Sequence, residues 1–256
     1  KDMNEKVLYM KLYTDTSKWT DLADKYAVRE YVKECGLEQY LIPLIGMWTD
    51  VDQIDFSSLP KSFIFKANNG VGKSELQMVK GDINVEETKK FLQGLLDRKN
   101  VGLLSAEPHY HTMKPCIIAE ELLPSEEGEK SPVDYKIYCA NGKAKYIWVC
   151  SGRDSNGTEV MTYDRDWNIR PDLCVFDSRY REGKVRPKPS NLDEMLKVAE
   201  TLVKPFPFVR LDLYNINGKI YFGEMTFTPL GGMVNFHPQE FLDEMGDSID
   251  LNYPNI

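Results

Sequence analysis

The chain is 256 residues long, and its composition, with 42% hydrophobic and 28% charged residues, is close to that of an average soluble globular protein. Fibrous, collagen-like and low-complexity proteins are thereby excluded, and the length fits one large domain or two closely packed ones. The 32 Lys and Arg residues against 40 Asp and Glu residues give a net charge of -8, which argues against non-specific binding of nucleic acid. An anionic ligand would therefore need a local cluster of positive side chains.

The five cysteines are odd in number and show no CxxC spacing, a pattern typical of reduced thiols rather than of a disulfide or zinc framework. No apolar run approaches the roughly 18 residues that a membrane-spanning helix needs, and the first residues lack the apolar core of a signal peptide. We therefore expect a cytoplasmic protein without membrane insertion. The missing initiator Met suggests a chain cut from something longer.

The first part of the sequence predicts one helix followed by two strands. Apolar spacing indicates a helix over residues 22–36, which carries Arg29 and ends at Gly36 as a C-cap. Residues 41–45 and 62–67 have the composition of strands.

The middle of the chain predicts a helix, a buried strand and a linker. Asn84 has the position of a helix N-cap, and the helix continues to about Arg98. Residues 116–119 form an apolar strand that ends in two glutamates. The stretch 124–132 is rich in Glu, Ser, Gly and Pro, so we place the boundary between two subdomains there.

The second half of the chain contains two hairpin signals. Asn141-Gly142 and Asn217-Gly218 each stand between runs of strand-forming residues. A helix over residues 192–203 lies between the hairpins, which indicates an α+β protein rather than strict βα alternation.

The glycine loop, residues 69–74, follows a predicted strand and offers backbone N–H groups to phosphates, with Lys73 and Ser74 adding a charge and a hydroxyl group. It is not a P-loop, because Ala67 stands where the first glycine of that motif is required. A plain connection remains the alternative. Lys66, a cation near the end of an apolar strand, favours the phosphate-binding interpretation.

The strongest local signal is the hairpin of residues 208–226, where a period of two puts Arg210 and Asp212 on one face. A two-residue turn would leave Glu224 on the opposite face. A three-residue loop of residues 216–218 would bring Glu224 and Thr226 onto the face of Asp212. We predict the three-residue loop, because two neighbouring carboxylates make a hard-oxygen site for Mg²⁺. The alternative is a solvated face with a cross-strand pair of Arg and carboxylate.

Together these residues resemble an ATP-grasp enzyme. The order that carries the resemblance is Asp24-Lys25 and Arg29, Lys66, the glycine loop, Glu120-Glu121, Asp134-Tyr135-Lys136, Arg210-x-Asp212, Glu224-x-Thr226 and Gly231-Gly232. The segments LADKYAVREYV, YLIPLIG, LPKSFIFKANNG, VDYKIYCANGK and FVRLDLYNINGKIYFGEMTFTPLGG are similar to the TupA-like branch (teichuronopeptide biosynthesis), found in bacterial surface-polysaccharide pathways. The resemblance covers nearly the whole chain.

The resemblance implies that ATP binds between two subdomains. Arg29 and Lys66 would hold its phosphates, Lys136 would add a cation towards them, and Asp134 would bind the ribose. The part of the glycine loop over the phosphates would comprise Asn69, Gly70, Gly72, Lys73 and Ser74. The adenine would meet Glu120 and the backbone of Glu121, Leu122 and Leu123.

The same resemblance implies the metal-binding and catalytic roles. Asp212 and Glu224 would coordinate Mg²⁺, and Arg210 would stabilise the oxyanion that forms when an amine attacks an acylphosphate. Many ATP-grasp ligases have Asn where this chain has Thr226, so we expect this hydroxyl group to be a weaker metal ligand.

Three other features have ordinary explanations. His109 and His111 lack the further ligands that a metal site needs. Asp164-x-Asp166 has the pattern with which many glycosyltransferases bind a metal and a nucleotide sugar, but turn chemistry explains it equally well. The basic run of residues 153–186 fits either a rim for an anionic sugar or polymer, or a solvated surface.

We therefore predict an α+β protein with the ATP-grasp fold, in which two α+β subdomains clamp ATP. Residues 1–60 would form an N-terminal helix and lead-in strands. Residues 61–132 would form the small subdomain with the glycine loop, and residues 133–256 the large subdomain with the metal site.

The activity implied is that of an ATP-dependent carboxylate–amine ligase, which forms an amide through an acylphosphate. Its substrates would be small molecules: an amino acid or small amine, and a uronic acid, a nucleotide-linked sugar or a glutamyl carboxylate, in the biosynthesis of a capsular or other cell-surface polysaccharide. Fusion to, or association with, other polysaccharide enzymes is a further expectation. The alternatives are a glycosyltransferase of the same pathway that uses Asp164-x-Asp166, and a nucleotide-binding protein without catalysis. The second is disfavoured by the presence of Lys66, Arg210, Asp212 and Glu224.

Overall fold

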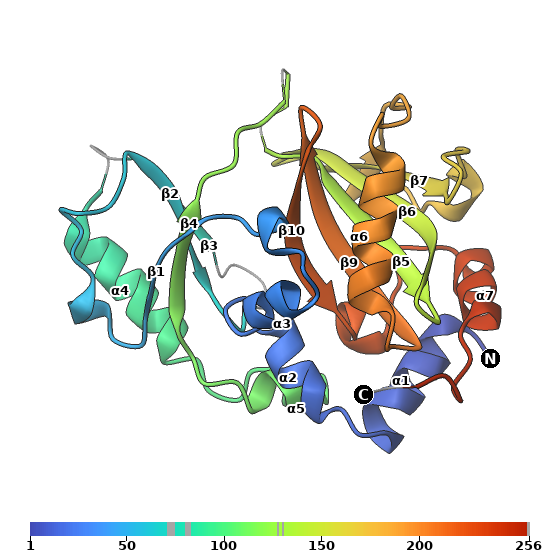
Figure 1. Ribbon diagram of the computed structural model, residues 1–256, viewed down its shortest axis with the longest axis horizontal. Helices are drawn as coiled ribbons and strands as arrows, with labels where there is room; N and C mark the ends of the chain where they lie inside the picture. The colour runs from blue at the N-terminus through green and yellow to red at the C-terminus, as the bar shows by residue number, and fades with distance from the viewer. Residues whose placement is uncertain (71–74, 80–82, 127, 130, 255–256) are drawn as a thin grey trace.

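The computed structural model describes residues 1–70, 75–79, 83–126, 128–129 and 131–254. Its strands form two sheets, and helices pack against each of them (Figure 1). In the part of the chain that is described, no helix is both long and apolar enough to cross a membrane.

The small sheet is antiparallel and has the strand order β1-β4-β2-β3. Its strands are β1 (Leu44–Trp48), β2 (Ser62–Ala67), β3 (Glu75–Val79) and β4 (Ile117–Glu121). Helix α4 (Val85–Leu96) packs on this sheet, where Leu92 and Leu95 join Phe63 and Phe65 in a separate hydrophobic cluster. The sheet thus has a core of its own.

The sequence located most of these elements. The strand over residues 62–67 is confirmed, and Asn84 caps α4 by accepting a hydrogen bond from the Glu87 amide at 3.2 Å. The strand predicted over residues 41–45 instead starts at Leu44. Pro43 has no N–H group to donate to a sheet, although its carbonyl oxygen accepts a hydrogen bond from the Glu121 amide.

The large sheet has six strands in the order β10-β9-β5-β6-β7-β8, and only the pairing of β7 with β8 is parallel. Its strands are β5 (Asp134–Ala140), β6 (Lys143–Asp154), β7 (Gly157–Asp164), β8 (Tyr180–Glu182), β9 (Phe208–Ile216) and β10 (Lys219–Thr226). Helix α6 (Leu192–Val203) confirms the helix predicted over residues 192–203, and it contacts β5, β6 and β9. The polar stretch of residues 124–132 connects the two sheets, and its described residues are neither helix nor strand.

The remaining helices are short, and several of them belong to the N-terminal region. They are α1 (Met3–Tyr13), α2 (Ser17–Ala23), α3 (Val28–Glu34), α5 (Pro108–His111) and α7 (Gln239–Ser248), with 3-10 turns at Glu38–Tyr40, Val51–Gln53, Pro171–Leu173 and Pro229–Gly232. Helix α1 packs against α7, and α2 contacts α5 and β10. Helices α2 and α3 therefore lie between the two sheets (Figure 1).

The single helix predicted over residues 22–36 is wrong, because the chain forms α2 and α3 with a turn between them. The Asp24 carboxylate accepts hydrogen bonds from the amides of Tyr26 and Ala27 at 2.7 and 3.1 Å. A short acidic side chain that bonds to nearby amides in this way competes with helix continuation. The end at Gly36 is as predicted, with a φ of 73°.

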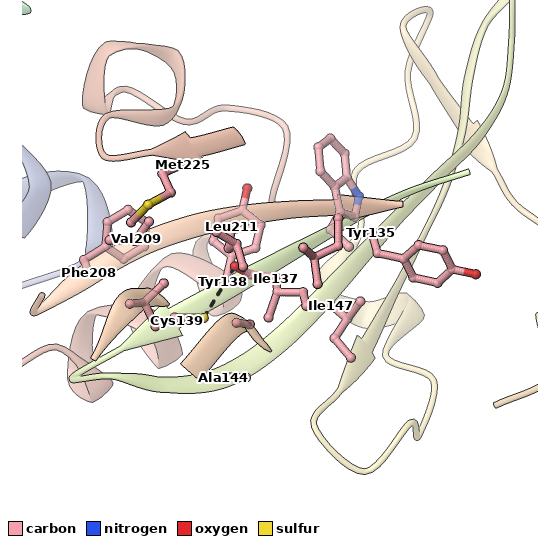
Figure 2. Packing of buried hydrophobic residues seen from close by; sticks show 14 of the residues in the cluster. Tyr135, Ile137, Tyr138, Cys139, Ala144, Ile147, Phe208, Val209, Leu211 and Met225 are labelled. Carbon is pink, nitrogen blue, oxygen red and sulfur yellow. Dashed lines mark hydrogen bonds between the residues drawn. The ribbon is translucent and has the colours of Figure 1, made fainter. Parts of the chain in front are cut away.

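The main core packs on both faces of the large sheet, and its apolar residues on one face fix which strand positions carry the charges on the other. Ile137, Leu211 and Ile147 lie opposite one another on β5, β9 and β6, and all are fully buried (Figure 2). Their neighbours in the sequence, Lys136 and Asp212, point to the other side because strand side chains alternate. The apolar packing therefore determines where these charges lie.

The turn between β9 and β10 differs from the predicted three-residue loop. Ile216 pairs with Lys219, which leaves a two-residue turn of Asn217 and Gly218 with φ angles of 52° and 84°. Both positions of such a turn need positive φ, which Asn and Gly adopt most easily, and its twist matches that of the strands. Asn141 and Gly142 form the same kind of turn between β5 and β6.

A β-bulge restores the shared face that the three-residue loop was expected to produce. Phe222 pairs with Leu213, but Glu224 pairs with Asp212, so Gly223 is an extra residue on β10. Thr226 then lies opposite Arg210. The bulge shifts the alternation of β10 by one residue. The prediction of the turn was wrong, but the predicted grouping of the four side chains is correct.

Gly223→Ala is expected to destabilise the protein, because a Cβ atom at this position would lie 2.8 Å from the Asp212 carbonyl oxygen. We expect a loss of about 1–3 kcal/mol in the free energy of unfolding, measured with urea. Gly94→Ala is the matched control, since α4 has open space there, and a gain of about 0.5–1 kcal/mol is expected. A Gly223→Ala protein as stable as the wild type would contradict the role given to the bulge.

Candidate functional site

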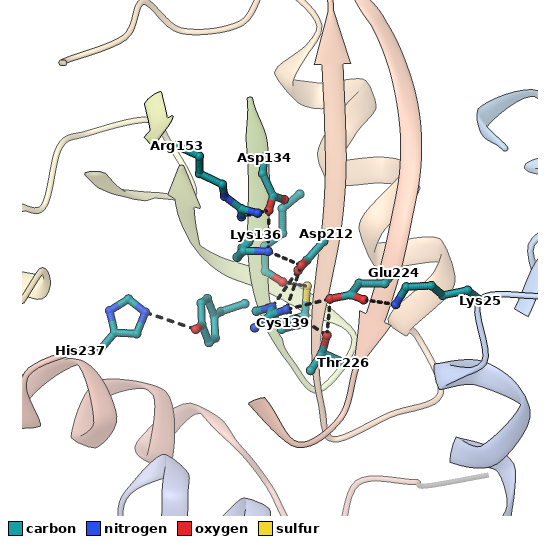
Figure 3. A network of polar contacts seen from close by, with 12 residues as sticks. Lys25, Asp134, Lys136, Cys139, Arg153, Asp212, Glu224, Thr226 and His237 are labelled. Carbon is teal, nitrogen blue, oxygen red and sulfur yellow. Dashed lines mark hydrogen bonds and ion pairs between the residues drawn. The ribbon is translucent and has the colours of Figure 1, made fainter. Parts of the chain in front are cut away.

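Strands β5, β9 and β10 carry a buried network of charges, in which Asp212 and Glu224 lie close together (Figure 3). Arg210 binds both of these carboxylates. Its guanidinium group donates two hydrogen bonds of 2.8 Å to the two carboxylate oxygens of Asp212. It also donates to Glu224 at 3.2 Å and to the Thr226 hydroxyl at 3.0 Å. Asp212 is only 4% exposed, and a carboxylate so far from water is tolerated only with such partners.

Lys136 joins this network from the neighbouring strand. Its ammonium group lies 2.6 Å from an oxygen of Asp134 and also contacts Asp212. Burial alone would lower the pKa of Lys136, but the two carboxylates raise it above its ordinary value. Arg153 contacts the same oxygen of Asp134 at 3.1 Å from the more exposed side.

Glu224 is the most exposed carboxylate of the network, with 35% of its side chain accessible. One oxygen accepts from Arg210, and the other lies 2.9 Å from the ammonium group of Lys25, which comes from the turn between α2 and α3. Removal from water would raise the pKa of Glu224, but Lys25, Arg210 and Lys136 hold it well below its ordinary value. The carboxylate is therefore charged at neutral pH.

A second group of charges lies on the small sheet. Glu120 is buried, and its two oxygens lie 3.0 Å from Arg29 and 3.1 Å from Lys66. Arg29 also donates to the Ile42 carbonyl oxygen at 2.9 Å. The side chain of Glu120 is thus paired with both predicted phosphate-binding cations.

A cavity of about 190 Å³ lies between the two groups of charges. Its lining comes from both sheets and from the connection between them: Ile42, Ile64, Lys66, Glu121, Leu122, Leu123, Ser131, Pro132, Asp134, Arg153 and Tyr214. Five of these residues were predicted from the sequence for nucleotide binding. One buried oxygen of Asp134, Oδ1, has no hydrogen-bond partner in the described structure. A ligand with a hydroxyl group would satisfy that oxygen.

The glycine loop begins at Asn69, three residues after the cavity-lining Lys66. Asn68 is buried, and its side chain donates to Asp24 at 2.6 Å and to the Lys114 carbonyl oxygen at 2.9 Å. Asn69 is also buried, and its side-chain oxygen has no partner in the described structure. Gly70 is described, whereas Gly72, Lys73 and Ser74 lie outside the described residues.

The three predicted metal ligands, Asp212, Glu224 and Thr226, lie together on adjacent strands. Asp212 and Glu224 face each other, and the Thr226 hydroxyl group lies 3.4 Å from Glu224. The described residues contain no cluster of three or more His, Cys, Asp or Glu side chains suited to a metal. A divalent cation at this place would need oxygen ligands from a bound molecule besides these side chains.

Two of the features that the sequence explained by ordinary chemistry lie outside this network. Asp164 is the last residue of β7, and its side chain accepts hydrogen bonds from the amides of Asp166 and Asn168 at 2.9 and 2.8 Å, as in a local turn. His109 is buried against Trp19 in an aromatic contact. Neither feature belongs to the network around Arg210.

The residues that sequence reasoning missed as parts of the site include Lys25, Asn68, Arg153 and Tyr214. Lys25 and Asn68 stood within segments that carried the resemblance, but their contacts depend on the turn between α2 and α3. The sequence placed Arg153 in a basic run and did not indicate its ion pair with Asp134. That pair forms between adjacent strands, and the pattern within one strand does not show it. Tyr214 lies two residues after Asp212 on β9, so its side chain is expected on the same face as Arg210 and Asp212. This spacing could have identified it.

Glu224→Gln is expected to weaken the acid dependence of stability. Its pKa is lower in the folded protein than the value of about 4.3 for an unfolded chain. Its contribution is therefore complete above that pH and is lost as the pH falls below it. We expect a loss of at most about 1 kcal/mol at pH 7 and a shallower decline between about pH 5 and pH 3, measured by urea unfolding.

The control is Glu240→Gln, which removes an exposed carboxylate from the first turn of α7. It should keep the wild-type decline of stability with acid. Equal slopes for the wild type and Glu224→Gln would show that the ion pairs of Glu224 do not stabilise the fold.

Three solved structures with the same fold are distant in sequence. D-alanine–D-alanine ligase from Bacillus anthracis complexed with ATP has 14% identity and a TM-score of 0.57 over 97% of this chain and 73% of its own. The L-amino acid ligase from Bacillus licheniformis has 12% identity and a TM-score of 0.54 over 89% of this chain and 49% of its own. An ADP complex of the PurK N5-carboxyaminoimidazole ribonucleotide synthetase has 11% identity and a TM-score of 0.52. The match covers 88% of this chain and 51% of that enzyme.

When this chain is compared with a second structure of the Bacillus anthracis ligase, it spans only 61% of the length of that enzyme. No curated protein matches the sequence. These likenesses establish the α+β ATP-grasp fold that the sequence predicted. The family model of the TupA-like ATP-grasp proteins matches residues 5–250, and the chain belongs to this family.

Proposed function

We propose that the protein is an ATP-dependent carboxylate–amine ligase that uses Mg²⁺. The observation that carries this proposal is the position of the cavity between the two sheets. Lys66 enters it from the small sheet and Asp134 and Arg153 from the large sheet, while Arg210, Asp212 and Glu224 lie together on the adjoining strands. A ligand in this cavity would contact both sheets at once.

The nucleotide would lie with its base against the connection between the sheets. Leu122, Leu123 and Ile64 supply an apolar lining, and the unpartnered oxygen of Asp134 suits a ribose hydroxyl group. Lys66 is a cation of the cavity that suits phosphate, although it too is paired with Glu120 here. Arg29 is turned towards Glu120 in this structure, so its contact with phosphate requires that Glu120 release it.

The donor set on β9 and β10 fits Mg²⁺, because it consists of two carboxylates and a hydroxyl group, all oxygen ligands. Asp212, Glu224 and Thr226 would hold the ion. When bound, it would neutralise the phosphate charge that develops during phosphoryl transfer. Arg210 is fixed by Asp212 and stays charged, as a group that stabilises an oxyanion must.

The family to which the chain belongs also suggests the substrates, and we include them in the proposal. The carboxylate would be that of a uronic acid, free or nucleotide-linked, or of a glutamyl chain, and the other substrate an amino acid or small amine. The product would enter a cell-surface polysaccharide. ATP chemistry and five free cysteines fit a cytoplasmic enzyme. Association with other enzymes of the pathway is part of the proposal, as are the subdomain boundaries at residues 61–132 and 133–256.

The alternative of a glycosyltransferase built on Asp164 and Asp166 has less support. Both oxygens of Asp164 accept hydrogen bonds within its own turn, from two amides and from the Asn168 side chain. A carboxylate so occupied is explained by local structure.

Nucleotide binding is expected to raise the melting temperature. With Mg²⁺ and a non-hydrolysable ATP analogue at about 100 times its Kd, we expect a shift of roughly 5 °C, measured by thermal unfolding. Lys66→Met should lose this shift, whereas Lys61→Met, a matched change at an exposed position shortly before β2, should keep it. A shift with sugar nucleotides but none with the ATP analogue would contradict the proposal.

Catalysis is expected to depend on β9 and β10 rather than on the turn after β7. In a screen of carboxylates and amines for phosphate release from ATP, Glu224→Gln and Asp212→Asn should reduce kcat by at least about 100-fold. Asp164→Asn should retain turnover. Near-ultraviolet circular dichroism checks that each variant is folded. Phosphate release that Glu224→Gln retains would contradict the metal-binding role proposed for Glu224.

A further inference from the structure

Lys25 occupies the side of Glu224 that faces away from Arg210. Its ammonium group lies 2.9 Å from Oε2 of Glu224, whereas Arg210 binds Oε1 (Figure 3). The Lys25 side chain is 13% exposed, so this pair is more shielded from water than a surface ion pair. Both oxygens of the carboxylate are therefore engaged by cationic side chains.

The turn that carries Lys25 is held by contacts that do not involve its side chain. The Lys25 amide donates to the Asn68 carbonyl oxygen at 3.2 Å, and Asp24 accepts from the Asn68 side chain at 2.6 Å. The Cys116 amide donates to the Asn68 side-chain oxygen at 2.9 Å. This turn thus links Glu224 on the large sheet to the residue that immediately precedes the glycine loop on the small sheet.

An ammonium group and a divalent cation compete for the same carboxylate oxygen. A metal ion that binds Glu224 through Oε2 must displace Lys25, and the lysine then needs another anion. Phosphate oxygens of a nucleotide would supply that anion in the same place. The metal alone offers no such replacement.

We propose that Lys25 is a positioning residue that holds Glu224 in the nucleotide-free protein and opposes metal binding until nucleotide phosphates draw its ammonium group away. The inference rests on the proposed function, because it assumes that Glu224 is a metal ligand. It makes metal binding and nucleotide binding mutually dependent. The hydrogen bond from the Lys25 amide to the Asn68 carbonyl oxygen connects the displacement of Lys25 to the residue that precedes the glycine loop.

Mn²⁺ binding to the full chain without nucleotide tests this role, with the free ion measured by electron paramagnetic resonance. Lys25→Met should bind Mn²⁺ more tightly than the wild type, by roughly fivefold, because the competing ammonium group is gone. Lys25→Arg keeps a cation beside Glu224 and should bind Mn²⁺ as the wild type does. Adding Glu224→Gln to Lys25→Met should remove the gain.

Arg153→Met is the matched control for overall charge. Arg153 pairs with Asp134 in the same network, but its recorded ion pair does not involve Glu224. We expect its removal to change Mn²⁺ affinity less than Lys25→Met does. An equal gain in both variants, or a Lys25→Met protein that binds Mn²⁺ no more tightly than the wild type, would overturn the inference.

Thermal unfolding with the ATP analogue separates this inference from the proposed function. If the analogue still stabilises the wild type and Lys66→Met loses the effect, a negative Mn²⁺ result refutes only the role of Lys25. If the analogue has no effect on the wild type, the ligase proposal fails, whatever the Mn²⁺ result. A gain in Lys25→Met that Glu224→Gln abolishes would support the competition in either case.

Discussion

The site depends on one interaction, the two parallel hydrogen bonds from Arg210 to Asp212 on β9. Both side chains are more than nine-tenths buried, and each would be costly to leave there without the other. Lys136 and Glu224 attach to this pair from the strands on either side. The pair therefore sets the geometry of three neighbouring strands, and its cost of burial is offset by the apolar packing of Ile137, Leu211 and Ile147 on the other face.

The bulge at Gly223 gives this network its fourth member. A regular hairpin with the Asn217-Gly218 turn would have put Glu224 on the face of the hydrophobic core. One extra residue on β10 reverses that outcome, and only glycine allows the strand to approach the Asp212 carbonyl oxygen so closely. Local turn chemistry and the requirements of the site conflict here, and the bulge satisfies both.

The break between α2 and α3 has a similar effect at the N-terminal side. Asp24 ends α2, accepts hydrogen bonds from amides of the turn before α3 and accepts another from the Asn68 side chain. The turn so formed brings Lys25 to Glu224. Residues far apart in the sequence, on both sheets, thus meet around one carboxylate. Two buried oxygens near the site, on Asn69 and Asp134, have no hydrogen-bond partner in the described structure. Asn69 lies on the small-sheet side and Asp134 on the large-sheet side. An arrangement with cations already placed and acceptors unsatisfied suits a polyanionic ligand that also carries hydroxyl groups.

The sequence by itself determined the α+β class, most strands, α4, α6 and the grouping of Arg210, Asp212, Glu224 and Thr226, because these follow from local periodicity, capping and family resemblance. It located Lys66, Asp134 and the segment 121–123, which line the cavity together. The tertiary structure alone decided the bulge at Gly223, the turn at Asp24 and the pairing of Lys25 with Glu224. These features depend on contacts between segments distant in sequence, whose energies local patterns do not contain. The pairing of the Glu120 carboxylate with Arg29 and Lys66 was decided in the same way, because the three residues are far apart in the sequence.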